Sequence, residues 1–116
     1  MSALGIATAT LFQRYAEIIE IEQASGAIDP FADDRYLSLE NLAWMCAHGI
    51  AHSDSLPIDK ISRWLGCVQG CLAMRGCLDL GHERDVSRPL FHDAYKGSGI
   101  EIPSSRARVN GSHPQV

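Results

Sequence analysis

Two histidines of this chain have a spacing at which a metal ion can be bound. His48 and His52 lie four residues apart, the spacing at which two imidazoles on one helix face can share a zinc ion. Zinc proteases with this spacing carry a glutamate directly after the first histidine, whereas Gly49 occupies that position here. Cys46 falls on the apolar side of the predicted helix. We therefore expect no bound metal, and we interpret the histidines as a surface or half-buried pair next to Trp44.

Three of the four cysteines gather near the end of the third predicted helix, at Cys67, Cys71 and Cys77. Two thiolates four residues apart could contribute to a metal site, but the C-x-x-C spacing typical of zinc sites is missing. We interpret these cysteines as small packing residues, with a redox thiol as the alternative. Because we expect no export signal, we expect all of them to be reduced.

A pair of carboxylates on the first predicted helix could hold magnesium. Glu17 and Glu20 are three residues apart, and all-α enzymes that hydrolyse nucleotide pyrophosphates can bind Mg²⁺ with such pairs. Those enzymes need a second acidic pair, for which the candidates are Asp59, Asp79, Glu83 and Asp85. These four residues do not form an E-x-x-D pattern. We therefore interpret Glu17 and Glu20 as part of a solvated helix face.

Basic residues repeat at helical spacing in the second half of the chain. Arg84, Arg88 and His92 follow one another at intervals of four residues. Lys60 and Arg63 lie on the polar side of the third predicted helix. These residues could bind an anion such as a nucleotide phosphate, or an acidic partner. The alternative is ion pairing with neighbouring acids, which include Asp59, Glu83, Asp85 and Asp93.

No catalytic motif stands out in the sequence. A GxxxxGK phosphate loop, a GxSxG nucleophile elbow and a GxGxxG dinucleotide turn are all absent. Cysteine and histidine occur together in too many proteins for that pairing to nominate a nucleophile. We therefore predict no catalytic residues, no cofactor and no enzymatic activity.

Hydrophobic spacing predicts an all-α fold. Helices are expected over about residues 3–25, 39–51 and 57–75, where apolar residues recur at intervals of three and four. Ser38 is a suitable N-cap for the second helix, and Gly76 a suitable left-handed stop for the third. No segment alternates strictly between apolar and polar residues, as strands do. We therefore predict a compact bundle of about four helices.

A fourth helix is expected near the end of the domain. Ser87 is a suitable N-cap, Pro89 fits the first turn, and Gly97 ends the pattern. Beyond it, proline, serine and glycine are frequent and apolar residues are few. A chain of 116 residues is long enough for one core. We predict a single helical domain over residues 1–97 and a flexible tail over residues 98–116.

The third predicted helix is the most apolar, and we expect the bundle to be built around it. Its buried face is expected to include Ile58, Ile61, Trp64, Leu65, Val68, Leu72 and Met74. Gly66 and Gly70 lie one turn apart on it, in a ridge of small residues. Because glycine costs about 1 kcal/mol against alanine in a helix, we expect another helix to pack closely there. In the connection after the first helix, Ile28 and Phe31 are expected to enter the core.

The charge distribution bears on the kind of partner. The formal net charge is −4, and Arg14 is the only basic residue among the first 34. Proteins that bind DNA or RNA normally carry a clustered basic face, because phosphate contacts supply much of their affinity. We therefore expect no direct binding of nucleic acid, and a basic protein surface is the better-suited partner. No apolar run of about 20 residues predicts a membrane span, and no signal peptide is expected, which favours the cytoplasm.

Residues 56–72 read LPIDKISRWLGCVQGCL, and residues 83–92 read ERDVSRPLFH. Together they resemble small uncharacterised proteins encoded by tailed bacteriophages and prophages, in which the core approximates D/E-K-x-x-R-W-L-G-F-x-Q-G. Cys67 stands here where an aromatic residue is common in those proteins. The resemblance implies a phage or prophage origin. Small acidic phage proteins often block a host or defence protein, and anti-CRISPR or other anti-defence inhibition is the sharpest form of this hypothesis.

We predict a non-enzymatic binding protein that acts in the bacterial host cytoplasm on a host or defence protein. Its contact residues are expected among polar and aromatic side chains outside the core, namely Trp44, His48, Lys60, Arg63, Gln69, Arg84 and Arg88. One alternative is a self-associating structural or regulatory module, with its interface at the glycine ridge or at Trp44. Another is a nucleotide-binding or pyrophosphohydrolase-like protein that uses the acidic or basic residues.

Overall fold

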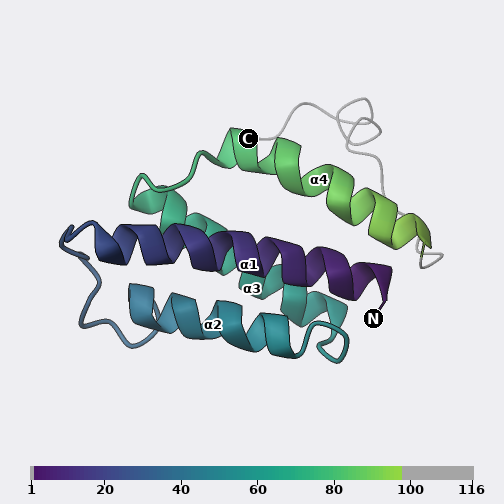
Figure 1. Cartoon of the computed structure of the whole chain (residues 1–116), viewed down its shortest axis with the longest axis horizontal. Coiled ribbons are helices and arrows are strands. Elements are labelled where there is room, and N and C mark those ends of the chain that lie inside the picture. Colours follow the sequence, from purple (N-terminus) through teal and green to yellow (C-terminus); the bar gives the residue numbers. More distant parts are fainter. Residues whose placement is uncertain (1, 98–116) are drawn as a thin grey trace, which may run out of the picture.

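The structure describes residues 2–97, apart from the side chain of Tyr95. Four helices and their connections make up this range. In this computed structural model they are α1 (Ala3–Ala24), α2 (Leu39–Ala51), α3 (Ile58–Met74) and α4 (Leu80–Gly97), and no strand occurs in this range. The predicted all-α bundle is therefore confirmed (Figure 1). The predicted flexible tail, residues 98–116, lies outside the described residues.

Helix α1 is the element around which the others are arranged. It packs against each of the other three helices, whereas the backbones of α2 and α4 do not approach each other. Figure 1 shows α1 running between α2 and α4, with α3 behind it. The two largest fully buried side chains, Tyr15 and Phe12, are on α1, and Leu11 and Ile19 of the same helix are also fully buried. The bundle is thus built around α1. The prediction that it is built around the third helix, α3, is wrong.

Local residues determine several helix ends. The Ser38 hydroxyl accepts a hydrogen bond from the backbone N–H of Asn41 at 3.1 Å and caps α2, as predicted. Gly26 and Gly76 follow α1 and α3, and each has a φ of 77°, which glycine adopts at little steric cost. These signals act within a few residues of the helix end, which is why the sequence reveals them.

The start of α4 differs from the prediction. The helix begins at Leu80, because Asp79 caps it: the Asp79 carboxylate accepts from the N–H of His82 at 3.2 Å. Ser87 is therefore not an N-cap, and Pro89 lies inside the helix rather than in its first turn. An internal proline removes one helical hydrogen bond. The additional turns compensate by bringing Glu83 into contact with α1, as described below.

The core is formed by apolar side chains of α1, α2 and α3. Three residues that we had expected in it lie outside: Ile28 is 93% exposed, Met74 is 64% exposed and Ile58 is 42% exposed. Trp64 is half-buried and packs against the core, whereas Phe31 is half-buried with its ring against Arg75. Ile58 and Met74 occupy the two ends of α3, beyond the stretch that the neighbouring helices cover.

Close packing at a glycine occurs on α2 instead of α3. A Cβ atom added at Gly49 would overlap the ring of Phe12, so α1 and α2 approach as closely as they do because Gly49 has no side chain. The predicted ridge is wrong, since a Cβ at Gly66 or Gly70 would meet no atom within 4 Å. Those two glycines line an apolar hollow of about 630 Å³, together with Leu37, Cys67, Cys71, Ala73, Met74 and Leu80.

A buried ion pair holds the connection between α1 and α2 against the end of α3. The Asp29 carboxylate accepts from Arg75 Nη2 at 2.8 Å and Nε at 3.0 Å, and from the N–H groups of Phe31 and Leu39, each at 3.0 Å. Arg75 also donates to the carbonyl oxygens of Cys71 and Leu37. Burial alone would raise the pKa of the Asp29 carboxyl, but these hydrogen bonds from Leu39, Phe31 and Arg75 hold it below its ordinary value.

The two kinds of glycine predict opposite effects of the same substitution. Gly49→Ala forces a methyl group against the Phe12 ring, and we expect it to lower the free energy of unfolding by about 1–3 kcal/mol, as overpacking does. Gly66→Ala has open space and gains helix propensity, so we expect a rise of up to about 1 kcal/mol. Urea denaturation followed by circular dichroism measures both. Equal effects of the two substitutions would contradict the packing described here.

The Asp29 ion pair predicts a dependence on acid. Because the folded-state pKa is lowered, its contribution to stability is present above the ordinary carboxyl value of about 4 and is lost as pH falls through the folded value. At neutral pH we expect Asp29→Asn to reduce the free energy of unfolding by about 1–3 kcal/mol. Below about pH 4 the difference from the wild type should narrow. Denaturation curves between neutral and acidic pH test this, and a constant difference would refute it.

Candidate functional site

A row of aromatic and imidazole rings lies on the surface where α2 meets α3. Trp44 stacks on His48 with ring centres 5.2 Å apart and planes 20° apart, and His48 lies 4.4 Å from His52. Trp64 joins from α3, 5.8 Å from Trp44 and 5.4 Å from His48, and Lys60 Nζ lies 5.2 Å from the Trp64 ring centre. We call these five residues the aromatic face.

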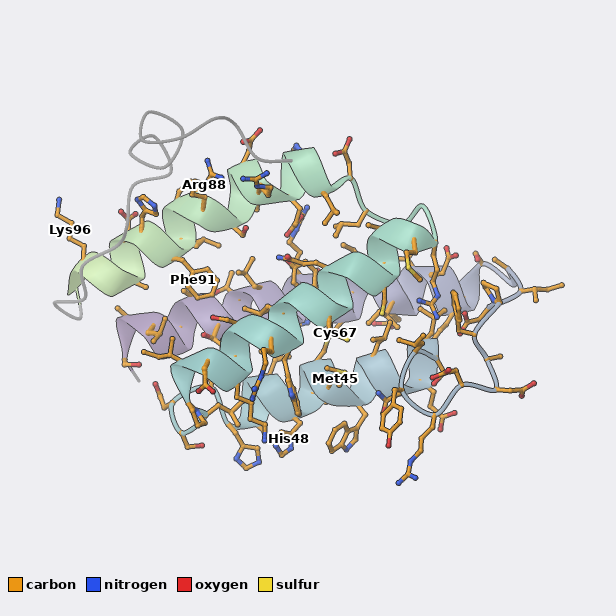
Figure 2. All side chains as sticks on the ribbon, turned by 180° about the vertical axis from the view of Figure 1, so that it is seen from behind. Met45, His48, Cys67, Arg88, Phe91 and Lys96 are labelled. Carbon is orange, nitrogen blue, oxygen red and sulfur yellow. The ribbon has the colours of Figure 1, made fainter. Side chains whose placement is uncertain are left out.

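The helical repeat of α2 positions this row. Leu42, Cys46 and Gly49 are buried against α1, so Trp44 and His48 lie on the opposite side of the helix. Trp44 remains 56% exposed in spite of its size. Figure 2 shows His48 pointing away from the bundle at the outer edge of α2.

An acidic hollow adjoins the aromatic face at Trp44. Its volume is about 430 Å³, and it is lined by Ala32, Asp33, Asp34, Arg35, Ser38, Glu40, Asn41 and Trp44. The lining thus includes three carboxylates, those of Asp33, Asp34 and Glu40, and one guanidinium, that of Arg35. The Asp34 carboxylate also accepts from the N–H groups of Tyr36 and Leu37, each at 2.8 Å, and this shapes the turn before α2. The hollow can accommodate a cationic group beside an exposed indole ring.

The structure brings together three of the seven predicted contact residues, Trp44, His48 and Lys60, on the aromatic face. Arg63, one turn from Lys60, forms the predicted surface ion pair with Asp59 at 3.8 Å. Such an exposed pair contributes little to stability.

The other three predicted residues do not join them. Gln69 is half-buried and donates to the Tyr15 hydroxyl at 2.6 Å. Arg84 and Arg88 are exposed on α4, whose backbone does not approach α2. In Figure 2, Arg88 and His48 lie at opposite edges of the bundle. The seven residues therefore do not form one surface.

Sequence reasoning missed the acids of the hollow and left His52 out of the contact residues. A signal was present, because Glu40, Trp44, His48 and His52 follow one another at intervals of four along α2. Residues four apart share a helix face. The position of Asp33 and Asp34 could not be derived in this way, since it depends on the path of the connection held by the Asp29 ion pair.

A second cluster of polar groups lies inside the bundle. The Glu83 side chain, 1% exposed, accepts from Arg14 Nη2 at 3.0 Å and Nε at 3.1 Å, and from the Tyr15 hydroxyl at 2.6 Å. Burial, together with the hydrogen bond to Glu83, raises the pKa of the Tyr15 hydroxyl far above its ordinary value. The hydrogen bond with Glu83 also raises the pKa of Arg14. Both Glu83 oxygens thus accept hydrogen bonds from within the protein. Because Gln69 of α3 donates to the Tyr15 hydroxyl, the cluster joins α1, α3 and α4.

This cluster removes Glu83 from the proposed magnesium ligands. Glu17 and Glu20 are exposed on α1, and Glu17 accepts from Gln13 at 3.2 Å. Among the described residues, no group of three or more His, Cys, Asp or Glu side chains is arranged to hold a metal ion. Within the same residues, no helix is long and apolar enough to cross a membrane.

The cysteines are free thiols. Burial raises the pKa of the Cys46 thiol to about 12. Burial, and to a smaller extent Cys71, raises the pKa of Cys67, and burial with the nearby Glu22 raises that of Cys77. A thiol that keeps its proton at neutral pH is a weak nucleophile. The surroundings of these three thiols therefore favour the protonated form.

Substitution of Glu83 tests the internal cluster. Glu83→Gln keeps the shape but removes the charge that Arg14 and Tyr15 contact, and we expect the free energy of unfolding to fall by about 1–3 kcal/mol. The expected loss is smaller than for a fully buried ion pair, because the Arg14 side chain is 38% exposed and can be hydrated when Glu83 is replaced. Glu17→Gln, on the surface of α1, is the control and should change it by less than about 0.5 kcal/mol. Chemical denaturation measures the free energy of unfolding of both variants. Equal losses of this free energy would contradict the role given to Glu83.

Comparison of the chain with protein-family models, with curated proteins and with solved structures gave no match. Its function is therefore inferred from its residues and their arrangement.

Proposed function

We propose that this chain is a non-enzymatic binding protein that docks a basic segment of another protein on the aromatic face and the adjoining acidic hollow. The observation that carries the proposal is Trp44, which borders both and is 56% exposed. Tryptophan is one of the residue types enriched among those that dominate binding energy at protein interfaces. An indole that projects from a rigid helix beside a hollow has the properties of such an anchor.

The neighbouring rings prepare Trp44 for binding. Its stacking on His48, and the contact with Trp64 across the helix boundary, restrict the indole before a partner arrives. Binding then costs less side-chain entropy than it would for a freely rotating residue. The contact between Lys60 and Trp64 shows the same surface already holding one cation near a ring.

The charges favour a basic partner. Asp33, Asp34 and Glu40 outnumber Arg35 in the hollow, and the whole chain has a formal net charge of −4. An arginine of a partner could place its guanidinium over Trp44 while it pairs with a carboxylate. Complementary charge also accelerates association.

The proposal extends to an origin and a target class. The segment that resembles phage and prophage proteins, residues 56–72, includes Lys60 and Trp64 of the aromatic face. This supports a chain that binds a host or bacterial-defence protein in the bacterial cytoplasm and inhibits it, in the manner of anti-CRISPR or other anti-defence proteins. Blocking a basic groove of the target is the mechanism that the acidic hollow suits.

Self-association is a second candidate, favoured by one observation. The apolar hollow beside Gly66 and Gly70 is bordered by Met74, 64% exposed, and Leu80, 47% exposed. Apolar surface of this kind commonly marks an interface. Sedimentation velocity at micromolar concentrations distinguishes this candidate from a monomeric binding protein.

Trp44→Ala tests the docking face. We expect it to weaken the binding of a fluorescein-labelled arginine-rich peptide by about tenfold or more, measured by fluorescence anisotropy, because it removes the anchor ring. Ile21→Ala, which shortens an exposed apolar residue of α1, is the matched control and should bind as the wild type does.

The same variants serve in affinity capture from bacterial lysate. A protein retained by the wild type and by Ile21→Ala, but lost with Trp44→Ala, is the expected result. Peptide binding unaffected by Trp44→Ala, together with capture of no saturable partner, would overturn the proposal.

A further inference from the structure

We propose that His48 and His52 form a two-histidine site for a divalent late transition-metal ion. The inference concerns an ion rather than a protein, and it does not rest on the docking function proposed above. It starts from the distance between the two imidazoles, whose ring centres are 4.4 Å apart.

This distance suits two ligands in adjacent positions on one ion. With metal–nitrogen bonds of about 2.0–2.1 Å, the centres of two such imidazoles lie about 4.5–5 Å apart. The planes of His48 and His52 differ by 41°. Because His52 is exposed, its ring can turn a nitrogen toward an ion bound by His48, and histidines four residues apart on one helix turn can share an ion in this way.

The backbone holds the pair at this spacing. The N–H of His52 donates to the carbonyl of His48 at 3.0 Å, which closes the last turn of α2. Trp44 covers one side of the His48 ring and limits its rotation. His52 is exposed, so an ion reaches the pair directly from solvent. The backbone therefore holds the two histidines in place, and the site is open to solvent at His52.

The surroundings set the strength and the type of ion. Imidazole is a ligand for Cu²⁺, Ni²⁺ and Zn²⁺, and affinity among them is highest for Cu²⁺. No third His, Cys, Asp or Glu completes a cluster in the described part of the chain, so water occupies the remaining positions. The Lys60 ammonium, close to Trp64, is the nearby cation that opposes binding. The Asp54 carboxylate, two residues beyond His52, is engaged elsewhere, because it accepts hydrogen bonds from the backbone N–H and the hydroxyl of Ser2.

The missing glutamate, which contributed to our expectation that no metal is bound, does not bear on this site. That residue supplies a general base for hydrolysis, whereas the two histidines alone supply the metal-binding geometry. An ion here would add positive charge beside the acidic hollow.

The two tryptophans of the chain provide a direct measurement. Trp44 and Trp64 lie 5.2 and 5.4 Å from His48, close enough for a bound paramagnetic ion to quench their fluorescence. The probe is Ni²⁺, because Cu²⁺ oxidises thiols and Cys67 is exposed. Protein without an affinity tag is titrated with NiCl₂ at neutral pH. We expect saturable quenching with one ion bound per chain.

Single substitutions show whether both histidines contribute. His48→Gln and His52→Gln should each weaken Ni²⁺ binding by about tenfold or more, because a second ligand on the same helix acts at high effective concentration. His92→Gln, an exposed histidine on α4, is the matched control and should leave the affinity unchanged. As a second readout, Ni²⁺ should raise the melting temperature of the wild type and of His92→Gln, but not of His52→Gln.

Quenching that does not saturate, or that survives His52→Gln with the wild-type affinity, would overturn the proposal and mark adventitious binding. Circular dichroism confirms that each variant is folded. The docking function is judged separately, because it depends on peptide binding by Trp44→Ala in metal-free buffer.

Discussion

The placement of α4 depends on the contact between Glu83 and the Arg14–Tyr15 pair of α1. Glu83 and Ala94 are the only buried residues of this helix among its described side chains, while Leu90 and Phe91 are partly buried against the core. Apolar contacts on α4 are therefore few, and a charged, fully hydrogen-bonded carboxylate adds direction to the attachment. Removal of either partner leaves a charge without its counterpart, so such a pair is more effective at specifying one arrangement than at adding stability.

Apolar packing and a charged contact also have separate roles at the other end of the bundle. Apolar side chains of α1, α2 and α3 supply the core, while the Asp29–Arg75 ion pair fixes the long connection that leads into α2. That connection carries Asp33 and Asp34, so the acidic hollow owes its shape to an interaction outside it. The aromatic face needs no such support, because three of its residues follow from the repeat of one helix.

These differences explain which features the sequence revealed. The local pattern was sufficient to predict the spans of α1, α2 and α3, the Ser38 cap, and the glycines that follow α1 and α3. Each of these features depends on neighbours within a few residues. The start of α4 was misplaced because Ser87 followed by Pro89 is a strong local signal, while the actual cap, Asp79, is supported by the distant contact of Glu83.

Residues that meet across the bundle were beyond local reasoning. Glu83 lies 69 residues from Arg14, and Arg75 lies 46 residues from Asp29. Spacing also could not show which glycine lies opposite a large ring, so Gly66 and Gly70 were preferred to Gly49. For the candidate site, helical spacing grouped Trp44 with His48, but it could not show that Gln69 turns inward to Tyr15.

The proline inside α4 gives that helix an uneven character. Pro89 lies between Glu83, which fastens the first turns to α1, and Ala94, the buried residue of the last turns. With one hydrogen bond missing from the ladder at this point, the two halves of α4 are less strongly coupled to each other than in an uninterrupted helix. The segment after Pro89 is attached to the bundle by Ala94 and by Leu90 and Phe91, which pack against the core. The last helix is therefore attached by a carboxylate before its proline and by apolar side chains after it.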